Sequence, residues 1–263
     1  MKQRCIFCKR DSEDSRSKEH ILPESLGNTR HVLKPGVVCD ACNNYFSLKL
    51  EGPILASGYF QTLRFRQALP NKKGRITPQK AILGKDIIVT LNRDAESKKM
   101  LVAVPSERWD EAANLKGGTI IFPVSGPKPD PNLMSRFLCK VGFEAFAQRI
   151  LMTSEVKRTE LVDDIQLDSI RSWARYGTGA KEWGFIERRI YDEDHAHLHL
   201  RESWQVVHEW DFLVTEHHEI YFIIAIFGVE YALNMGGPSV DGYQEWLNKN
   251  KQQSPLYTGK NAQ

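Results

Sequence analysis

The pattern of apolar and polar positions divides the chain into a short polar part and a longer part with regular elements. Residues 1–52 hold few periodic apolar stretches and are rich in Cys, His, Asn and Gly. A short helix with a basic face is predicted at 58–69. Further on, apolar runs predict strands at 81–92, 100–105 and 119–124, with a helix at 106–115 before the last of them.

The C-terminal half predicts helices first and strands afterwards. Residues 132–152 have a helical period with a wide apolar face, and a second helix is predicted at 167–176. Strands are then predicted at 183–191, 197–200, 204–214 and 218–229, with a hairpin turn at 215–217. The fold class is therefore α+β, with a small unit at 1–55 and a larger mixed α/β body with antiparallel strands at 56–263. The proline-rich stretch 126–131 is a candidate boundary within that body.

Composition is that of an ordinary globular protein. Hydrophobic residues make up 41% of the chain and charged residues 26%. No apolar run reaches the length needed to cross a bilayer, and Gly228 interrupts the longest, 220–229. The basic start of the chain is not followed by an apolar segment, so we expect no secretory signal and a cytoplasmic protein.

The net charge of +3 conceals an asymmetry. Residues 1–80 hold fifteen Lys and Arg against seven Asp and Glu, whereas the remainder holds twenty-one against twenty-six. An excess of positive charge in the first part favours a polyanionic partner. The candidate phosphate contacts are Arg64, Arg66, Lys72 and Lys73, and the alternative for them is a solvated basic face.

Four of the five cysteines form two C-x-x-C pairs. Cys5 and Cys8 are separated by thirty residues from Cys39 and Cys42, and Cys139 stands alone in an apolar helical stretch. Each C-x-x-C pair places two thiolates on one tight turn, so the two pairs together satisfy a tetrahedral zinc. Redox-active thiols are the alternative. Because four thiolates leave no open coordination position, such a zinc is structural, and Cys139 is expected in the core.

The residues around the cysteine pairs resemble the HNH endonuclease superfamily, in the subgroup with two C-x-x-C pairs. Glu19-His20-Ile21-Leu22-Pro23 begins eleven residues after Cys8 and is followed by a glycine turn at Gly27-Asn28, and Asn43-Asn44 directly follows Cys42. The resemblance covers residues 5–55. It implies a zinc-stabilised ββα-metal module, with a ββ hairpin that packs on a helix near 43–50.

The resemblance also implies roles in phosphodiester hydrolysis. His20 is the expected general base, a task suited to a side chain that exchanges protons near neutral pH. Glu19 and Asn43 are the expected ligands of a catalytic Mg²⁺ or Mn²⁺, which favours carboxylate and amide oxygens. Asn44 is the second choice as a ligand. The implied products carry a 5′-phosphate and a 3′-hydroxyl.

This chain departs from the family pattern at three places. The acidic position is Glu19 where Asp is commoner, and Gly27-Asn28 stands where the family often has two glycines. The middle asparagine of the three-letter motif does not align cleanly. Lys34 is near the expected place, and Asn28 and His31 are the other candidates.

Several functions stay open at this stage. The leading hypothesis is a metal-dependent endonuclease acting on DNA, in a bacterial or phage defence or restriction context, with RNA not excluded as a substrate. A junction-resolving, structure-selective nuclease is a variant of it. The alternative from another class is a zinc-stabilised module that binds nucleic acid or protein without cutting, with His20 as a buried histidine and Asn43 as a helix cap. A second copy of the chain or another protein is an open partner, and no membrane is expected.

One further cluster could bind a metal. His195, His197 and His199 alternate and would share one face of a strand. The alternative is a solvated strand edge.

Overall fold

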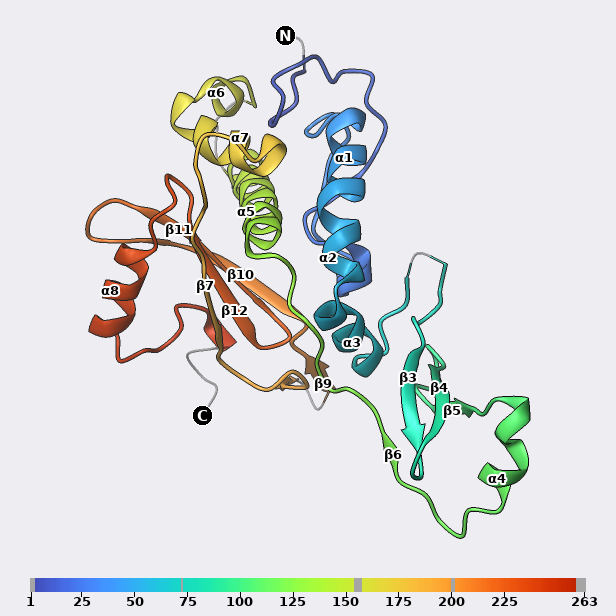
Figure 1. Ribbon diagram of the computed structural model, residues 1–263. Coiled ribbons are helices and arrows are strands. Elements are labelled where there is room, and N and C mark those ends of the chain that lie inside the picture. Colours follow the sequence, from blue (N-terminus) through green and yellow to red (C-terminus); the bar gives the residue numbers. More distant parts are fainter. Residues whose placement is uncertain (1–2, 72, 154–157, 200–201, 259–263) are drawn as a thin grey trace. The chain divides into compact units, whose positions relative to one another are not determined.

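The computed structural model describes residues 3–71, 73–153, 158–199 and 202–258. The chain divides into two compact units, one of residues 1–22, 28–51 and 130–263 and the other of residues 23–27 and 52–129. Both contain helices and antiparallel strands, which confirms the expected α+β class (Figure 1). The boundary at residue 55 that the sequence suggests stays a prediction.

The N-terminal part of the first unit is a ββα arrangement. Strands β1 (Glu19–His20) and β2 (Val32–Leu33) pair antiparallel, with Glu19 opposite Leu33 and His20 opposite Val32. Helix α1 (Asp40–Phe46) follows and continues as one wide turn, η2 (Ser47–Glu51). The helix expected near 43–50 is thus confirmed, and it begins earlier, with the acidic Asp40 in its first turn, where negative charge is favourable.

The described residues in the rest of the first unit form four further α-helices, a short 3-10 helix and two sheets. The helices are α5 (Pro131–Thr153), α6 (Arg158–Asp163), α7 (Asp168–Tyr176), with the short η4 (Ile165–Leu167) before it, and α8 (Asp241–Lys249). The larger sheet has the order β10 (His208–Val214), β11 (Ile220–Ile226), β12 (Val229–Asn234) and β7 (Ile186–Arg189). A separate hairpin pairs β8 (Ala196–His199) with β9 (Glu202–Gln205). In the part of the chain that the structure describes, no helix combines the length and apolar character that a bilayer span requires.

The larger sheet is covered on both faces, as Figure 1 shows for α5 and α8. On one face, Tyr221 and Ile223 pack in a cluster with Tyr243 of α8. On the other face, Phe222 lies against Gly142 of α5, where an added Cβ would come within 2.8 Å of the ring. Strand β11 is buried at every position from Tyr221 to Ile226 because each face has a helix against it.

Two of the predicted C-terminal strands are wrong in extent. The run predicted at 218–229 contains β11 and the turn after it and ends at Val229, the first residue of β12, and 204–214 contains a break between β9 and β10. Gly228 forms the hairpin turn with φ +78°, and a Cβ there would lie 2.0 Å from the carbonyl oxygen of Tyr191. Strand β12 escaped prediction because Glu230 interrupts its apolar pattern. That carboxylate is fully buried and accepts hydrogen bonds from Arg188 and Tyr243 at 2.5 and 2.8 Å.

The second unit has a four-stranded sheet of its own. Its order is β5 (Met100–Ala103), β4 (Ile87–Arg93), β3 (Gln79–Leu83) and β6 (Ile120–Ile121). The helical segments are η1 (Glu24–Leu26), α2 (Gly52–Ala56), α3 (Gly58–Arg66), η3 (Ser106–Arg108) and α4 (Trp109–Ala113). The strand predicted at 81–92 is wrong as one element, because Gly84 at φ +66° turns it into the β3–β4 hairpin.

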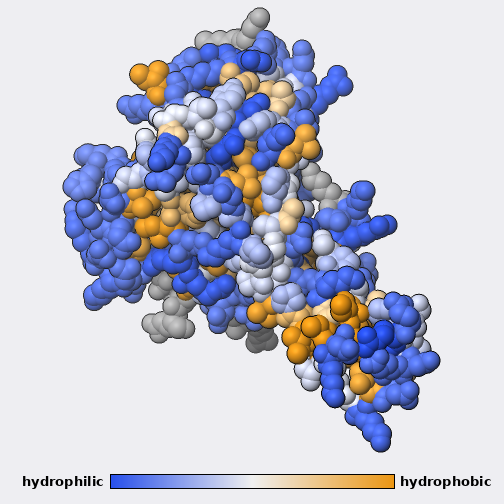
Figure 2. All heavy atoms as spheres, viewed as in Figure 1, coloured by the Kyte–Doolittle hydropathy of each residue, from blue (hydrophilic) through white to orange (hydrophobic). Residues whose placement is uncertain are grey.

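One face of this sheet forms the core of the second unit. Phe65 of α3 packs there with Val89 and Leu91. The outer face exposes apolar side chains, including Ile88 and Ile121, and Figure 2 shows them gathered over this sheet.

Candidate metal centre and active site

The four cysteines of the two C-x-x-C pairs converge in the first unit. Cys5 and Cys8 lie in a tight turn, Cys39 precedes α1, and Cys42 lies within its first turn. Their sulfur atoms all lie within 4.8 Å of one another, and the Sγ atoms of Cys8 and Cys39 are 3.6 Å apart. A tetrahedral zinc with bonds of about 2.3 Å separates its sulfurs by roughly 3.8 Å. The four thiols therefore fit a structural zinc, whereas Cys139 is fully buried in α5, as predicted.

The thiols shift one another's pKa values in opposite directions, and two neighbouring N–H groups donate to the cluster. Hydrogen bonds from the Cys42 and Cys5 thiols lower the pKa of the Cys8 thiol to about 2, while the Cys5 and Cys8 sulfurs raise the pKa of Cys42. The backbone N–H of Cys39 donates to Sγ of Cys5 at 3.3 Å, and Nε of Arg175 donates to Sγ of Cys42 at 3.4 Å. Donors of this kind stabilise the anionic ligands that zinc requires.

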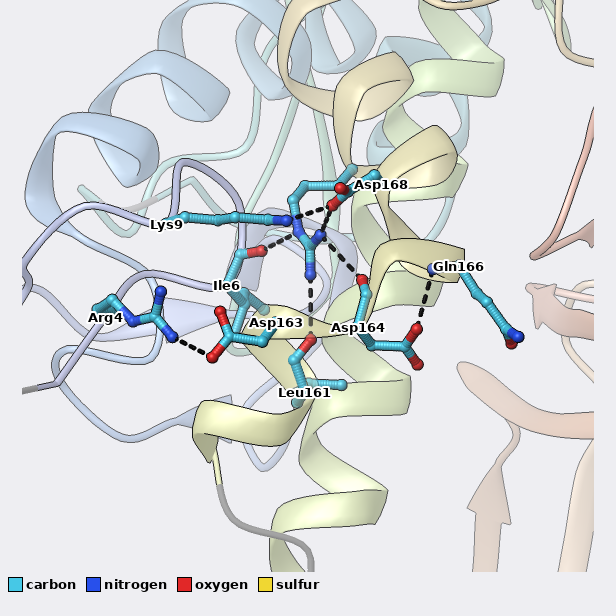
Figure 3. Close-up of polar contacts among 9 residues, drawn as sticks. Arg4, Ile6, Lys9, Leu161, Asp163, Asp164, Gln166 and Asp168 are labelled. Atoms are coloured by element: carbon cyan, nitrogen blue, oxygen red, sulfur yellow. Dashed lines mark hydrogen bonds and ion pairs between the residues drawn. The ribbon is translucent and has the colours of Figure 1, made fainter. Parts of the chain in front are cut away.

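The turn that carries Cys5 and Cys8 is fixed to α6 and α7 by polar contacts (Figure 3). Arg171 of α7 is 3% exposed and donates from Nε to the carbonyl of Ile6 at 2.5 Å and from Nη2 to the carbonyl of Leu161 at 3.1 Å. Two ion pairs flank this contact, Arg4–Asp163 at 2.5 Å and Lys9–Asp168 at 2.6 Å. The C-terminal helices thus support the cysteine turn directly.

Helix α1 is attached to the segment that leads into β1. Nδ2 of Asn43 donates to the carbonyl of Lys18 at 3.2 Å, and the Asp40 carboxylate accepts from the backbone N–H of Ser17 at 2.9 Å. Because Cys39 and Cys42 anchor the same helix turn, the cysteine cluster places Asn43 next to the strand that begins with Glu19. Asn44 is exposed on the same helix.

Glu19 and His20 leave β1 on opposite faces, as successive residues of a strand do. Glu19 is 4% exposed and turned toward α5, whereas His20 is half-buried. Among the residues that the structure describes, no hydrogen bond or ion pair joins Glu19 to Asn43. A cation shared by these two side chains therefore stays a prediction.

Asn28 connects the ends of the two strands. Its Nδ2 donates to the carbonyls of Leu22 and His31 at 2.8 and 2.9 Å, and its Oδ1 accepts from the N–H groups of Arg30 and His31 at 3.1 and 2.9 Å. The side chain is fully buried, so these bonds replace water at four backbone groups. Of the other two candidates for the middle motif position, Lys34 is exposed and the ring of His31 contacts Gln148 at 3.3 Å.

A buried lysine from α5 contacts Glu19. Nζ of Lys140 lies 2.6 Å from Oε1 of Glu19, 2.8 Å from Oε1 of Glu51 and 3.0 Å from Oε2 of Glu144. It also donates to the carbonyl of His20 at 3.1 Å. Sequence reasoning missed this cluster, although a lysine and a glutamate four residues apart inside an apolar helical run are an available signal.

The cluster carries three carboxyl groups for one ammonium group. Burial, opposed by the charge of Lys140, raises the pKa of Glu19, and burial together with the charge of Glu19 raises that of Glu144 well above its ordinary value. Burial disfavours the charged form of Lys140, but attraction by Glu144, Glu19 and Glu51 outweighs it and raises the pKa. One ammonium group does not balance three buried carboxyl groups, which is why both carboxyl shifts favour the protonated form.

Three of the four basic residues predicted to contact phosphate can be placed, all in the second unit. Lys73 is exposed, Arg66 is half-buried, and Arg64 of α3 is only 6% exposed. Burial lowers the pKa of Arg64, and its Nε and Nη2 have no hydrogen-bond partner among the described residues. Lys72 lies outside those residues. Phosphate contact by this group stays a prediction.

The alternating histidines also stay untested. His195 directly precedes β8, which carries His197 and His199, and the side chains of the last two lie outside the part of the chain that the structure describes. Within that part, the cysteine cluster is the one group of Cys, His, Asp or Glu gathered closely enough to hold an ion.

A comparison with known protein families bears on the segment that holds the cysteine cluster, Glu19, His20 and Asn43. Residues 5–57 match the model of the HNH endonuclease family, which confirms the resemblance drawn from the sequence. The match includes the four cysteines together with Glu19, His20 and Asn43. No curated protein and no solved structure matches the chain significantly.

Proposed function

Starting from the HNH endonuclease match of residues 5–57, we propose that the protein is a metal-dependent endonuclease that hydrolyses phosphodiester bonds in DNA. The observation that carries the proposal is the attachment of Asn43 to residue 18 by a hydrogen bond of 3.2 Å, beside a four-thiol cluster. This contact sets the amide of α1 against the strand with Glu19 and His20. A bacterial or phage defence role is consistent with this proposal, and a junction-resolving nuclease is a narrower version of it.

Each residue has a role in the proposed reaction. His20 takes a proton from the attacking water, because a half-buried imidazole can exchange protons and still be reached by solvent. Glu19 and Asn43 contribute a carboxylate and an amide oxygen as ligands of Mg²⁺ or Mn²⁺, which would neutralise the phosphate and stabilise the leaving oxygen. The cysteine cluster holds α1 in place and takes no part in the chemistry, since four thiolates leave no position for water.

The test is cleavage of supercoiled, linear, branched and single-stranded DNA, and of RNA, by the zinc-loaded protein with Mg²⁺, Mn²⁺ or EDTA. Nicking that depends on the divalent cation is expected. His20→Ala should lower the rate by about 100-fold or more, the range that general bases contribute. Its zinc content should equal that of the wild type.

A matched control is His217→Ala, at an exposed histidine of the β10–β11 turn. It removes an imidazole far along the chain from the HNH segment and should cut at the wild-type rate. Undiminished cleavage by His20→Ala would reject that residue as the base. No product from the wild type on any substrate would favour a zinc-stabilised binding module.

A further inference from the structure

Lys140 is the only fully buried lysine among the described residues, and it comes from outside the HNH segment. Burying an ammonium group costs several kcal/mol unless oxygen atoms replace its water. Five oxygen atoms do so here, at distances from 2.6 to 3.4 Å. A lysine with this environment is fixed in one position.

These oxygen atoms belong to three different elements. Oε1 of Glu19 and the carbonyls of His20 and Ile21 belong to β1 and the residue after it. Oε1 of Glu51 lies at the end of η2, the continuation of α1. Glu144 is one turn further along α5 and faces Lys140 from the same helix. A single ammonium group therefore bonds to the strand that carries the proposed base and to the helix that carries the proposed ligand Asn43.

We infer that Lys140 is a positioning residue of the nuclease site, an inference that rests on the proposed function. Its contact with Oε1 fixes the Glu19 side chain, while Oε2 of Glu19 is buried and has no hydrogen-bond partner among the described residues. Oε2 is the atom left for the divalent cation. The carbonyl contacts hold β1 at a set distance from α5, and the Glu51 contact does the same for α1.

A purely structural reading predicts something different. A buried ion pair is often no more stabilising than apolar residues of similar size, and three carboxyl groups around one ammonium are less favourable than a matched pair. If packing were the only role, methionine at position 140 would leave metal binding unchanged. If Lys140 orients Glu19, the same change weakens binding of the cation.

The experiment uses the zinc-loaded full chain and Lys140→Met. Free Mn²⁺ is followed by electron paramagnetic resonance during a titration, which reports binding whether or not the protein cuts DNA. We expect the Mn²⁺ dissociation constant to rise about 10–100-fold, the usual effect of losing a group that orients a metal ligand. In the cleavage assay kcat should fall while KM for DNA stays within about twofold, because Lys140 does not reach solvent.

Arg149→Met is the matched control. It removes a cation from the same helix, at an exposed ion pair with Asp211 of 2.7 Å, and should bind Mn²⁺ as the wild type does. If Lys140→Met does not fold or loses its zinc, Glu51→Gln is the second variant, since it keeps Lys140 and loosens its link to α1. It should also raise the dissociation constant.

The outcomes separate the two proposals. If Lys140→Met binds Mn²⁺ as tightly as the wild type, the role of Lys140 is overturned. If Lys140→Met does not fold, wild-type affinity in Glu51→Gln overturns it instead. Mn²⁺ binding by the wild type without cleavage of any nucleic acid overturns the nuclease and leaves the role of Lys140 to be judged from the dissociation constants. Absence of Mn²⁺ binding by the wild type overturns both.

Discussion

Two asparagines of the HNH segment use the same amide group for different tasks. Asn28 engages both its nitrogen and its oxygen in four backbone hydrogen bonds and is fully buried. Asn43 engages its nitrogen with the carbonyl of Lys18 and is half-buried. We infer that Asn28 holds the middle position of the HNH motif, since its side chain alone of the three candidates ties residue 22 to residue 31. The amide oxygen of Asn43 has no hydrogen-bond partner among the described residues, and it is the atom proposed to bind the divalent cation.

His208 gives a prediction at the scale of one residue. Burial, with a smaller contribution from the charge of His31, lowers the pKa of His208 to about 4. The unfolded chain, with its ordinary pKa near 6.5, therefore binds more protons than the folded chain below pH 6.5, and stability falls as the pH is lowered. Between pH 7 and 5 the wild type should lose about 2 kcal/mol of unfolding free energy through this residue.

The measurement compares urea unfolding of the wild type and His208→Phe at pH 7, 6 and 5. Phenylalanine cannot titrate and keeps a ring in the position that contacts His31, whose ring centroid is 5.7 Å away. The free energy of unfolding of the variant, minus that of the wild type, should therefore rise as the pH falls. Parallel curves would show that His208 is protonated equally in the folded and unfolded chains.

Single residues also show what the sequence could and could not predict at the site. The spacing of the cysteines predicted the cluster, because two C-x-x-C turns have few other uses together. The Asn28 contacts were left open, since three nearby residues were equally plausible without coordinates. Lys140 was missed because nothing local links it to Glu19, 121 residues earlier in the sequence. Only the packing of α5 on the ββα segment brings them together.

At the scale of elements, the long helix was predicted best, whereas α2, α6 and α8 were not predicted. Helix α5 spans 131–153 and was predicted at 132–152, because its long apolar period has no competing interpretation. The 81–92 run was taken as one strand although Gly84 turns the chain within it, and the 218–229 run was extended past the turn at Gly228. A buried strand has no alternation to mark its end, so the glycine with positive φ is the remaining signal.

Gly142 gives a prediction at this scale, where α5 crosses β11. An added Cβ would lie 2.8 Å from Cδ1 of Phe222, and that ring is itself packed against Phe212 at a centroid distance of 5.4 Å. Overpacking costs about 1–3 kcal/mol, whereas alanine in a helix returns about 1 kcal/mol relative to glycine. Gly142→Ala should therefore lower the free energy of unfolding by about 1 kcal/mol net.

A double-mutant cycle identifies the cause. In a Phe222→Ala background Cγ and the ring are gone, so Gly142→Ala should become neutral or stabilising when unfolding is measured in urea. The same loss in both backgrounds would mean that the ring does not limit the approach of α5.

At the scale of the whole molecule, the HNH segment does not stand alone. Residues 1–22 and 28–51 form one compact unit with 130–263, and Arg171 and Arg175 of α7 bond to the cysteine turn and to Cys42. The second unit has a core of its own around Phe65 and Val89. Bound zinc is thus expected to stabilise the first unit and to leave the stability of the second unit unchanged.

Removal of zinc tests this division. Without the metal, four thiols within 4.8 Å of one another lose the ion that offsets their thiolate charge, so the turn at Cys5 and the start of α1 should open. Hydrogen–deuterium exchange of the full chain, read by mass spectrometry before and after chelation, should show lost protection in 5–22 and 28–51. Strands β3 and β4 should keep their protection, because their core includes no metal ligand.

Cys42→Ser should reproduce the effect of the chelator, and Cys139→Ala, which removes a buried thiol outside the cluster, should not. Equal loss of protection in β3 and β4 would mean that the two units unfold as one, and unchanged protection in 5–22 would mean that α7 holds the cysteine turn without zinc.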